Sequence, residues 1–114
     1  MIIYNLVTNI YRKILRIYWS IFIPIHLKFL GATIYAHKKV IIGEQCLIGA
    51  DVKIFDTNFH SLKSENRGYN KEENDISSKK VVIGDNCFIG KNAIILKDCN
   101  LKKDTIIPAG SIIK

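Results

Sequence analysis

Residues 81 to 113, VVIGDNCFIGKNAIILKDCNLKKDTIIPAGSII, carry an aliphatic residue at every sixth position. A smaller residue stands two positions before each of them. The aliphatic positions are Ile83, Ile89, Ile95, Leu101, Ile107 and Ile113, and the smaller ones are Val81, Cys87, Ala93, Cys99, Thr105 and Ser111. Side chains of a strand alternate between its two faces, so residues two apart point the same way. Recurrence after six residues therefore indicates short strands joined at corners around one interior.

A short fixed period is typical of a solenoid, and hexapeptide repeats indicate a parallel β-helix. A coil of three such hexapeptides stacks Ile83 under Leu101, Ile89 under Ile107 and Ile95 under Ile113. Each buried isoleucine contributes about 1.5 to 3 kcal/mol relative to exposure. A set of antiparallel hairpins is the alternative, but hairpins have no reason to keep a period of six.

An earlier block has the same period at Ile42, Ile48 and Ile54, and the pattern is degenerate from residue 31 to 39. We therefore predict an all-β solenoid domain over residues 31–114. The chain of 114 residues is long enough for one domain. Solenoid coils contact only their neighbours, so we expect oligomerisation to bury the remaining apolar surface.

The repeat breaks after Ile54. The next inward position is occupied by His60, and the spacing from Ile54 to Ile83 is not a multiple of six. The polar residues 61–80 are therefore predicted to be an insertion that loops out of the solenoid. Long loops in compact domains are usually functional or disordered.

Two readings of His60 are open from the residues alone. It can be a hydrogen-bonded core histidine, although an aliphatic interior offers few partners for its two ring nitrogens. It can instead be a general base at the mouth of the loop, near Asp56 and Asn58.

Residues 1–30 form a separate N-terminal segment. Ile10, Ile14, Ile17, Tyr18 and Ile21 recur at helical spacing, which predicts an amphipathic α-helix that ends before Pro24. The helix either caps the first coil or lies on an anionic membrane surface. Its apolar run is too short to span a bilayer, and no small-residue cleavage site follows it.

Charge and cysteine content restrict the function further. Residues 1–43 carry +6 of the formal net charge of +7, which attracts anions, but no nucleic-acid-binding motif accompanies it. The three cysteines all occupy the small inward position, which predicts buried thiols and a reducing, cytosolic location. Neither the cysteines nor the histidines have the spacing of a metal site, so we expect no metal.

The Ile-Gly hexapeptides, the segment from Asp56 to Ser61, the polar loop, the resumption at Val82 and the Ala109-Gly110-Ser111 step resemble the hexapeptide-repeat acyltransferases. The similarity covers about residues 31 to 114 and is greatest to the maltose/galactoside and polysaccharide O-acetyltransferase branch. It implies a left-handed parallel β-helix and a homotrimer, with acetyl-CoA and a sugar or polysaccharide-precursor acceptor meeting in clefts between subunits.

By position, His60 matches the catalytic histidine of that family. The resemblance thus implies that His60 takes the proton of an acceptor hydroxyl while this oxygen attacks the thioester. Asp56 and Asn58 would bind acceptor hydroxyls or orient the imidazole, with a turn-stabilising role as the alternative. The resemblance also implies that the backbone amides around Gly90 to Ala93 lie beside the pantetheine arm of CoA and donate hydrogen bonds to the tetrahedral oxyanion. Lys97 and Lys114 would meet its phosphates, with solvated corner lysines as the alternative reading.

Relatives usually continue past the Gly-Ser step into another coil and a tail that holds the adenosine end of CoA, whereas this sequence stops at Lys114. We therefore expect weakened cofactor binding or an inactive chain. Three functions follow from the sequence: a sugar O-acetyltransferase of surface polysaccharide biosynthesis, a serine or xenobiotic acetyltransferase, and a non-catalytic scaffold or membrane-surface protein. We expect a cytoplasmic location, at the inner face of the membrane if residues 1–30 bind lipid.

Overall fold

The computed structural model describes residues 2–6, 21–22, 28–29, 31–68 and 75–114. These residues form short strands and one 3₁₀ turn, η1 (Ser64–Asn66). The strands are β1 (Ile2–Leu6), β2 (Ile21–Phe22), β3 (Lys28–Phe29), β4 (Ala32–Ala36), β5 (Val40–Ile42), β6 (Leu47–Ile48), β7 (Lys53–Phe55), β8 (Val81–Ile83), β9 (Phe88–Ile89), β10 (Ile94–Ile95), β11 (Asn100–Leu101), β12 (Ile106–Ile107) and β13 (Ile112–Ile113).

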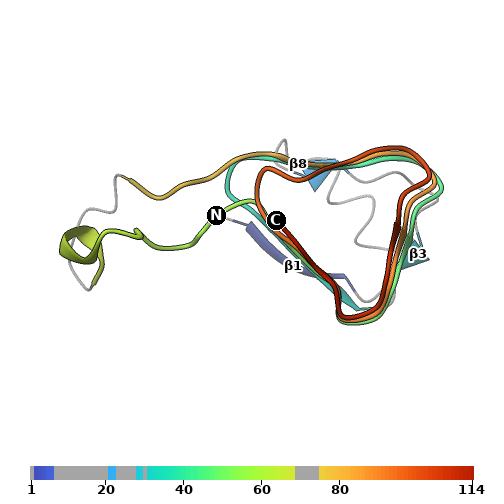
Figure 1. The fold of residues 1–114 in the computed structure, drawn as a ribbon, viewed down its shortest axis with the longest axis horizontal. Coiled ribbons are helices and arrows are strands. Elements are labelled where there is room, and N and C mark those ends of the chain that lie inside the picture. Colours follow the sequence, from blue (N-terminus) through green and yellow to red (C-terminus); the bar gives the residue numbers. More distant parts are fainter. Residues whose placement is uncertain (1, 7–20, 23–27, 30, 69–74) are drawn as a thin grey trace.

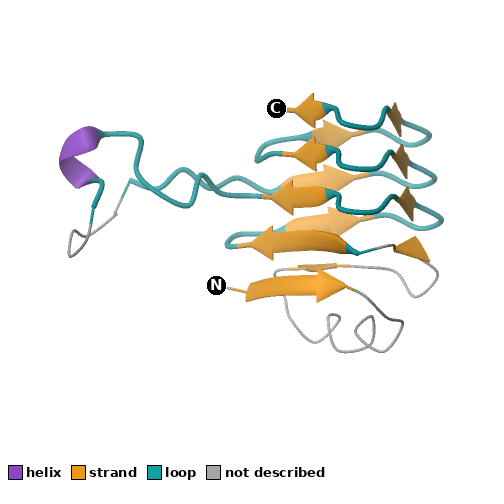
Figure 2. Ribbon diagram, turned by 90° about the horizontal axis from the view of Figure 1, so that it is seen from below, coloured by secondary structure: helices purple, strands orange, loops and turns teal. Residues whose placement is uncertain are grey.

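Three sheets form the sides of a triangle when the solenoid is viewed end-on (Figure 1). Sheet A has the order β1-β4-β7-β10-β13, sheet B β11-β8-β5-β2 and sheet C β12-β9-β6-β3. The chain visits A, B and C in turn, and the coils stack on one another (Figure 2). We call the places where it turns the AB, BC and CA corners. The predicted parallel solenoid is confirmed, and the hairpin alternative is excluded.

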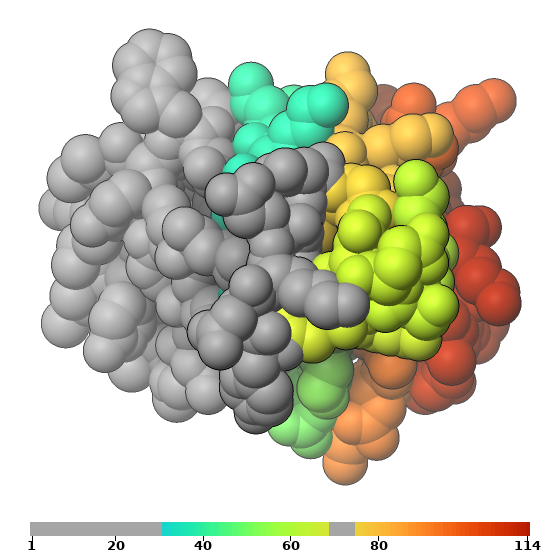
Figure 3. All heavy atoms as spheres, turned by 90° about the vertical axis from the view of Figure 1, so that its left-hand side faces the viewer, coloured from blue at the N-terminus to red at the C-terminus, as the bar shows by residue number. Residues whose placement is uncertain are grey.

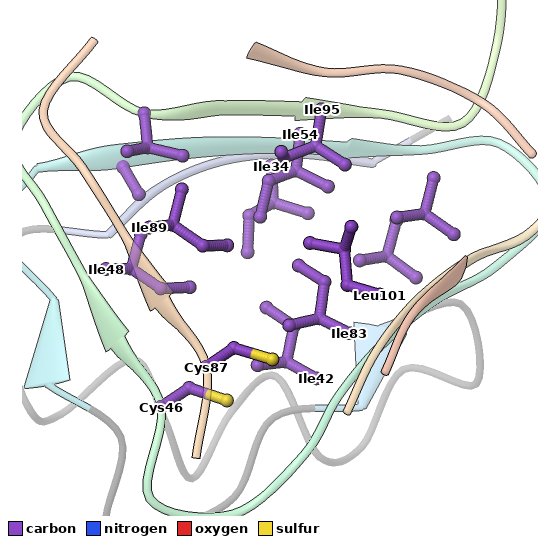
Figure 4. Close-up of a cluster of buried hydrophobic side chains, with 14 of the residues drawn as sticks. Ile34, Ile42, Cys46, Ile48, Ile54, Ile83, Cys87, Ile89, Ile95 and Leu101 are labelled. Carbon is purple, nitrogen blue, oxygen red and sulfur yellow. The ribbon is translucent and has the colours of Figure 1, made fainter. Parts of the chain in front are cut away.

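The register within each sheet places every inward residue over its equivalent in the previous coil. Ile83 pairs with Leu101, Ile89 with Ile107 and Ile95 with Ile113, as a coil of three hexapeptides predicts. Ile34, Ile54 and Ile95 continue one such column across sheet A and are each 0% exposed. Figure 4 shows these columns pointing into one interior from all three sheets.

Each regular corner contains one residue in the left-handed backbone region. In the C-terminal coils these residues are Asn86, Asn92, Asp98, Asp104 and Gly110, again six apart, with φ between 56° and 75°. Asparagine, aspartate and glycine tolerate this conformation better than other residues do. The backbone N–H groups of Asn86 and Asn92 donate to Glu44 and Ala50 of the preceding coil at 2.8 and 2.9 Å. The corners therefore both turn the chain and join adjacent coils.

Glycine follows the inward isoleucine wherever two corners approach closely. A Cβ atom on Gly90 would lie 2.5 Å from the backbone nitrogen of Ala109, and one on Gly84 would lie 2.6 Å from that of Lys103. The Ile-Gly repeat of the sequence is thus explained by contact between coils.

The N-terminal segment differs from the prediction where the structure describes it. β1 pairs antiparallel with β4, while β2 and β3 pair in parallel with β5 and β6. Ile21, which was expected in the helix, lies in β2 opposite Val40, because the first full coil presents backbone groups that another strand can pair. Phe22 also belongs to β2, and the remainder of the predicted helix, residues 10–20 and 23, lies outside the described residues.

The three cysteines are buried in the core, as their positions predict. Their thiols donate to backbone carbonyl groups: Cys46 to Gly84 at 3.1 Å, Cys87 to Lys102 at 3.2 Å and Cys99 to Ile113 at 3.3 Å. Burial is the main cause that raises the pKa of the Cys46 and Cys99 thiols above the ordinary value.

Substituting Gly90 with alanine should lower the free energy of unfolding by about 3 kcal/mol, because the added methyl group pushes two coils apart. Gly110→Ala is the matched control. Its Cβ would meet nothing within 4 Å, although its φ of 75° is strained for alanine, and that strain costs about 1 kcal/mol. Urea denaturation measures both, and equal losses would contradict the close-approach explanation.

The buried thiols should make stability depend on alkaline pH. A raised pKa in the folded state means that their contribution is complete below the ordinary thiol pKa of about 8.5 and is lost as the pH rises through the raised value. We expect the urea midpoint to fall between pH 8 and 10 less steeply in Cys46→Ala/Cys99→Ala than in the wild type. Parallel pH profiles would contradict this expectation.

Candidate functional site

The AB corner between β7 and β8 is the place where the coils become irregular. Ile95 pairs with Ile113 after one regular coil, whereas Ile54 pairs with Ile95 across a coil that is more than twice as long. The additional residues belong to a long arm, residues 56–80, which extends away from the triangular solenoid (Figures 1 and 2). The break predicted from the sequence is therefore a projecting insertion.

Asp56 anchors the start of the arm. Its side chain is fully buried, and its carboxylate accepts hydrogen bonds from the backbone N–H groups of His37 at 2.7 Å, Lys38 at 2.5 Å and Lys39 at 2.7 Å. These donors lie in the AB corner of the previous coil, where Ile34 and Ile42 are eight residues apart instead of six. The contacts of Asp56 are those of a side chain that stabilises a turn, and both of its oxygens are engaged.

A short antiparallel pairing closes the neck of the arm. Thr57 forms a β-bridge with Ser78, whose hydroxyl donates to the Thr57 hydroxyl at 2.8 Å. On either side, the N–H of Asn58 donates to Ser77 O at 3.0 Å and the N–H of Lys79 donates to Asp56 O at 2.9 Å. The two ends of the arm are thus held together at the surface of the solenoid.

Three aromatic rings fix the backbone next to this neck. The ring of Phe59 lies 4.4 Å from that of Tyr35 and 5.1 Å from that of Phe55, measured between centroids. Phe59 has a φ of 66°, so the chain reverses at this residue. Burial, and secondarily the negative charge of Asp56, raise the pKa of Tyr35, which keeps the phenol neutral.

His60 follows this aromatic cluster and is exposed. Its backbone N–H donates to Asn58 O at 2.8 Å, which makes a tight turn at the base of the arm. The reading of His60 as a buried core residue therefore does not hold. His60 therefore lies at the solvent-accessible surface of the base of the arm.

The distal part of the arm has its own polar contacts. The Asp75 carboxylate accepts a hydrogen bond from the Asn66 amide at 3.2 Å and lies 3.7 Å from the Lys63 ammonium group. Ser61 is buried, and its hydroxyl accepts a hydrogen bond from the N–H of Lys63 at 3.0 Å. The contacts of Asp75 join the two described sides of the arm, residues 56–68 and 75–80.

The other predicted site residues divide between two corners. Lys97 is half-buried in the AB corner, and the exposed Lys114 follows β13 at the register position of Leu96. Gly90 and Ala93 are buried in the CA corner. The N–H of Gly90 already donates to Ile107 O at 2.8 Å and that of Ala93 to Gly90 O at 3.2 Å. One chain alone therefore does not bring the predicted cofactor residues of the CA corner together with His60.

Among the described side chains, no three histidine, cysteine, aspartate or glutamate residues are grouped so that they could hold a metal ion. Within the same part of the chain, no helix has the length and apolar character needed to cross a membrane.

Two segments of the chain match known protein families. Residues 80–114 match "Bacterial transferase hexapeptide (six repeats)", and residues 39–54 match "Hexapeptide repeat of succinyl-transferase". Neither a curated protein nor a solved structure matches the chain. Hexapeptide repeats of the transferase type are therefore present on both sides of the arm, which indicates an acyltransferase in general terms.

Sequence reasoning missed the aromatic cluster and the binding of the 37–39 corner by Asp56. A signal for the second was present: a carboxylate directly after a strand, opposite a corner two residues longer than the others, is a candidate acceptor for that corner's backbone N–H groups. Tyr35 and Phe59 are distant in sequence and carry no shared period, so only the fold brings them together.

We predict that Asp56→Asn lowers the free energy of unfolding by roughly 3 kcal/mol, because an amide offers one oxygen acceptor where the two oxygens of the buried carboxylate accept from three backbone N–H groups. Asp51→Asn makes the same chemical change at an exposed residue of the CA corner, and it should change stability by less than about 0.5 kcal/mol. Urea denaturation of both variants checks this, and equal stability of the two would contradict the anchoring role.

Proposed function

We propose that the protein is an O-acetyltransferase that transfers the acetyl group of acetyl-CoA to a sugar hydroxyl during surface polysaccharide biosynthesis. The observation that carries the proposal is the position of His60. It stands exposed at the break of the transferase-type hexapeptide repeats, on a turn held by the aromatic cluster and the neck of the arm.

In the proposed reaction, the His60 imidazole accepts the proton of the acceptor hydroxyl while that oxygen forms a bond to the thioester carbonyl carbon. The tetrahedral intermediate then collapses, the carbon–sulfur bond breaks, and the proton passes to the departing CoA thiolate. General-base assistance of this kind contributes about 10² to 10⁴ in rate. Additional acceleration comes from holding the two substrates in reacting geometry.

A homotrimer of left-handed β-helices is the assembly that we propose for this reaction. The AB corner carries His60, whereas Gly90 and Ala93 lie at the CA corner. A cleft between two protomers can place His60 of one protomer next to Gly90 and Ala93 of another. Sheet C supports association, because Leu47, Phe88 and Ile106 form an outward column and are 46%, 47% and 69% exposed. Large exposed side chains in one column mark a surface that is covered in an assembly.

Within the cleft, the pantetheine arm lies along the backbone next to the buried residues Gly90 and Ala93, and Lys97 and Lys114 meet phosphate groups. Asn58, which is half-buried beside His60, is placed to contact the acceptor. Asp56 acts on the acceptor only indirectly, as a positioning residue, because its oxygens are occupied. Residues 1–30 give the cytoplasmic protein a peripheral contact with the inner face of the membrane.

A second candidate is a non-catalytic β-helical scaffold. It is favoured by the engagement of the Gly90 and Ala93 N–H groups in the solenoid, since these groups do not stabilise an oxyanion while so bonded. Acetyl-CoA separates the two candidates: a ligand at 100 times its Kd stabilises a protein by about 2.7 kcal/mol. A melting temperature that does not move at millimolar acetyl-CoA favours the scaffold. A serine or xenobiotic acceptor, the third alternative, is tested in the substrate panel below.

We predict that His60→Ala lowers kcat by about 10² to 10⁴. His37→Ala is the matched control, because His37 is also exposed at the AB corner, one coil earlier, and its side chain has no role in the proposed reaction. Release of CoA thiol from acetyl-CoA is followed with a panel of sugars, serine and a hydroxylated xenobiotic. Equal rates of the wild type and His60→Ala would remove His60 from the mechanism.

A further inference from the structure

The AB corner gathers lysines that are distant in the sequence. Six lysines lie at it: Lys38, Lys39, Lys79, Lys80, Lys97 and, after β13, Lys114. Figure 3 looks onto this corner, and the segments around residue 38 (turquoise) and residue 80 (gold) lie side by side above the arm. The acidic residues at the same corner are the exposed Asp98 and the buried Asp56.

The other two corners are nearly balanced in charge. The BC corner has Lys102 and Lys103 together with Glu44, Asp85 and Asp104, and the CA corner has Lys91 with Asp51. The positive charge at the AB corner is therefore a local feature and not a property of solenoid corners in general.

Register makes these lysines neighbours. Val40 pairs with Val81, and the N–H of Val81 donates to Lys39 O at 3.0 Å, so Lys39 and Lys80 are at equivalent positions of adjacent coils. Asp98 holds that position in the next coil, since Asn100 pairs with Val82. Like charges directly opposite each other in a sheet are destabilising. Such an arrangement is favourable when an anion lies between the charges.

The acids of this corner neutralise only part of its charge. The Asp98 carboxylate accepts a hydrogen bond from the Lys79 ammonium group at 2.9 Å, and this bond, with the nearby charges of Lys79 and Lys97, lowers the pKa of Asp98. The carboxylate of Asp56 is engaged by backbone N–H groups. Within the described part of the chain, Lys38 and Lys80 have no acidic partner.

We propose that the AB corner is a binding site for a ligand that carries two linked phosphate groups, held by Lys38, Lys80 and their neighbours beside His60. Lysine ammonium groups are common phosphate ligands, and their flexible stems adapt to a diphosphate. Binding of a diphosphate at this corner does not require that the protein is a transferase. Its role as a substrate subsite rests on the proposed function.

The phosphates would lie close to the proposed reaction centre. The N–H of Lys79 bonds to Asp56 O, and the four residues from Asp56 to His60 reach at most about 14 Å. Two substrates of the proposed reaction can supply a diphosphate: CoA, and an acceptor sugar activated as a nucleoside diphosphate. In the activated sugar the diphosphate is attached to the ring that carries the hydroxyl groups, whereas in CoA the pantetheine arm separates it from the thioester.

The test compares two double variants of the full chain with the same change in charge. Lys38→Gln/Lys80→Gln alters the AB corner, and Lys102→Gln/Lys103→Gln alters the BC corner. The Asp56 contacts survive both, because they use backbone N–H groups of residues 37–39. Inorganic pyrophosphate is titrated calorimetrically at low and at physiological salt, and circular dichroism verifies folding.

We expect the AB variant to bind pyrophosphate at least tenfold more weakly than the wild type, and the BC variant to bind within twofold. Equal losses in both variants, or no measurable pyrophosphate binding by the wild type, overturn the site. Binding of anionic lipid vesicles that depends on Lys38 and Lys80, without binding of pyrophosphate, also overturns it in favour of a membrane contact.

Two further ligands separate the sources of the diphosphate. A selective loss of CoA binding in the AB variant assigns the corner to the donor, and a selective loss of uridine diphosphate sugar binding assigns it to the acceptor. His60→Ala should bind pyrophosphate like the wild type. If that variant keeps full transferase activity while the lysine variant loses pyrophosphate binding, the proposed catalytic role fails and the phosphate site stands.

Discussion

The structure depends on one constraint: an inward side chain must lie over its equivalent in the next coil. The register of three hexapeptides per coil meets this constraint in the columns that continue Ile83, Ile89 and Ile95. Because the coils stack in direct contact, the residue after the inward isoleucine must be small where two corners meet, as at Gly90. The turn itself needs a left-handed residue, which recurs with the same period. The residue types at three positions of the hexapeptide, namely the inward residue, the residue after it and the left-handed corner residue, thus follow from a single packing requirement.

Such a regular solenoid has little room for polar chemistry. Its interior is aliphatic, and its backbone N–H groups are used to join the coils, as the bonds of Gly90 and Asn92 illustrate. A functional site can therefore lie where the six-residue period is interrupted. At such a place, other contacts must hold the chain in position, because the regular pairing between coils is lost. Asp56 does so by binding the backbone of the previous coil, and Phe59 does so by packing between Tyr35 and Phe55.

Much of the fold could be predicted from the sequence, because the sequence is periodic. The three sheets, the stacking partners of the C-terminal coils, the buried thiols and the break at residue 60 all follow from spacing. What could not be read depends on single contacts between distant residues, such as that of Tyr35 with Phe59. The helix predicted up to Pro24 was wrong at Ile21. Aliphatic residues at spacings of three and four fit a helix, and they give no sign of a strand partner that comes later in the chain, as Val40 does.

The irregular coil also explains why charge collects at one corner. An insertion removes the six-residue spacing, so the residues that return to the solenoid, Lys79 and Lys80, are placed by the neck of the arm and by pairing with the previous coil. They arrive beside Lys38 and Lys39, whose backbone is held by Asp56, and the exposed acid at the equivalent position of the next coil is Asp98. The Asp56 anchor therefore lies at the same corner as the lysines. The proposed general base and the proposed anion-binding surface would thus have a common physical origin, and we expect the substrate held at this corner, donor or acceptor, to be negatively charged.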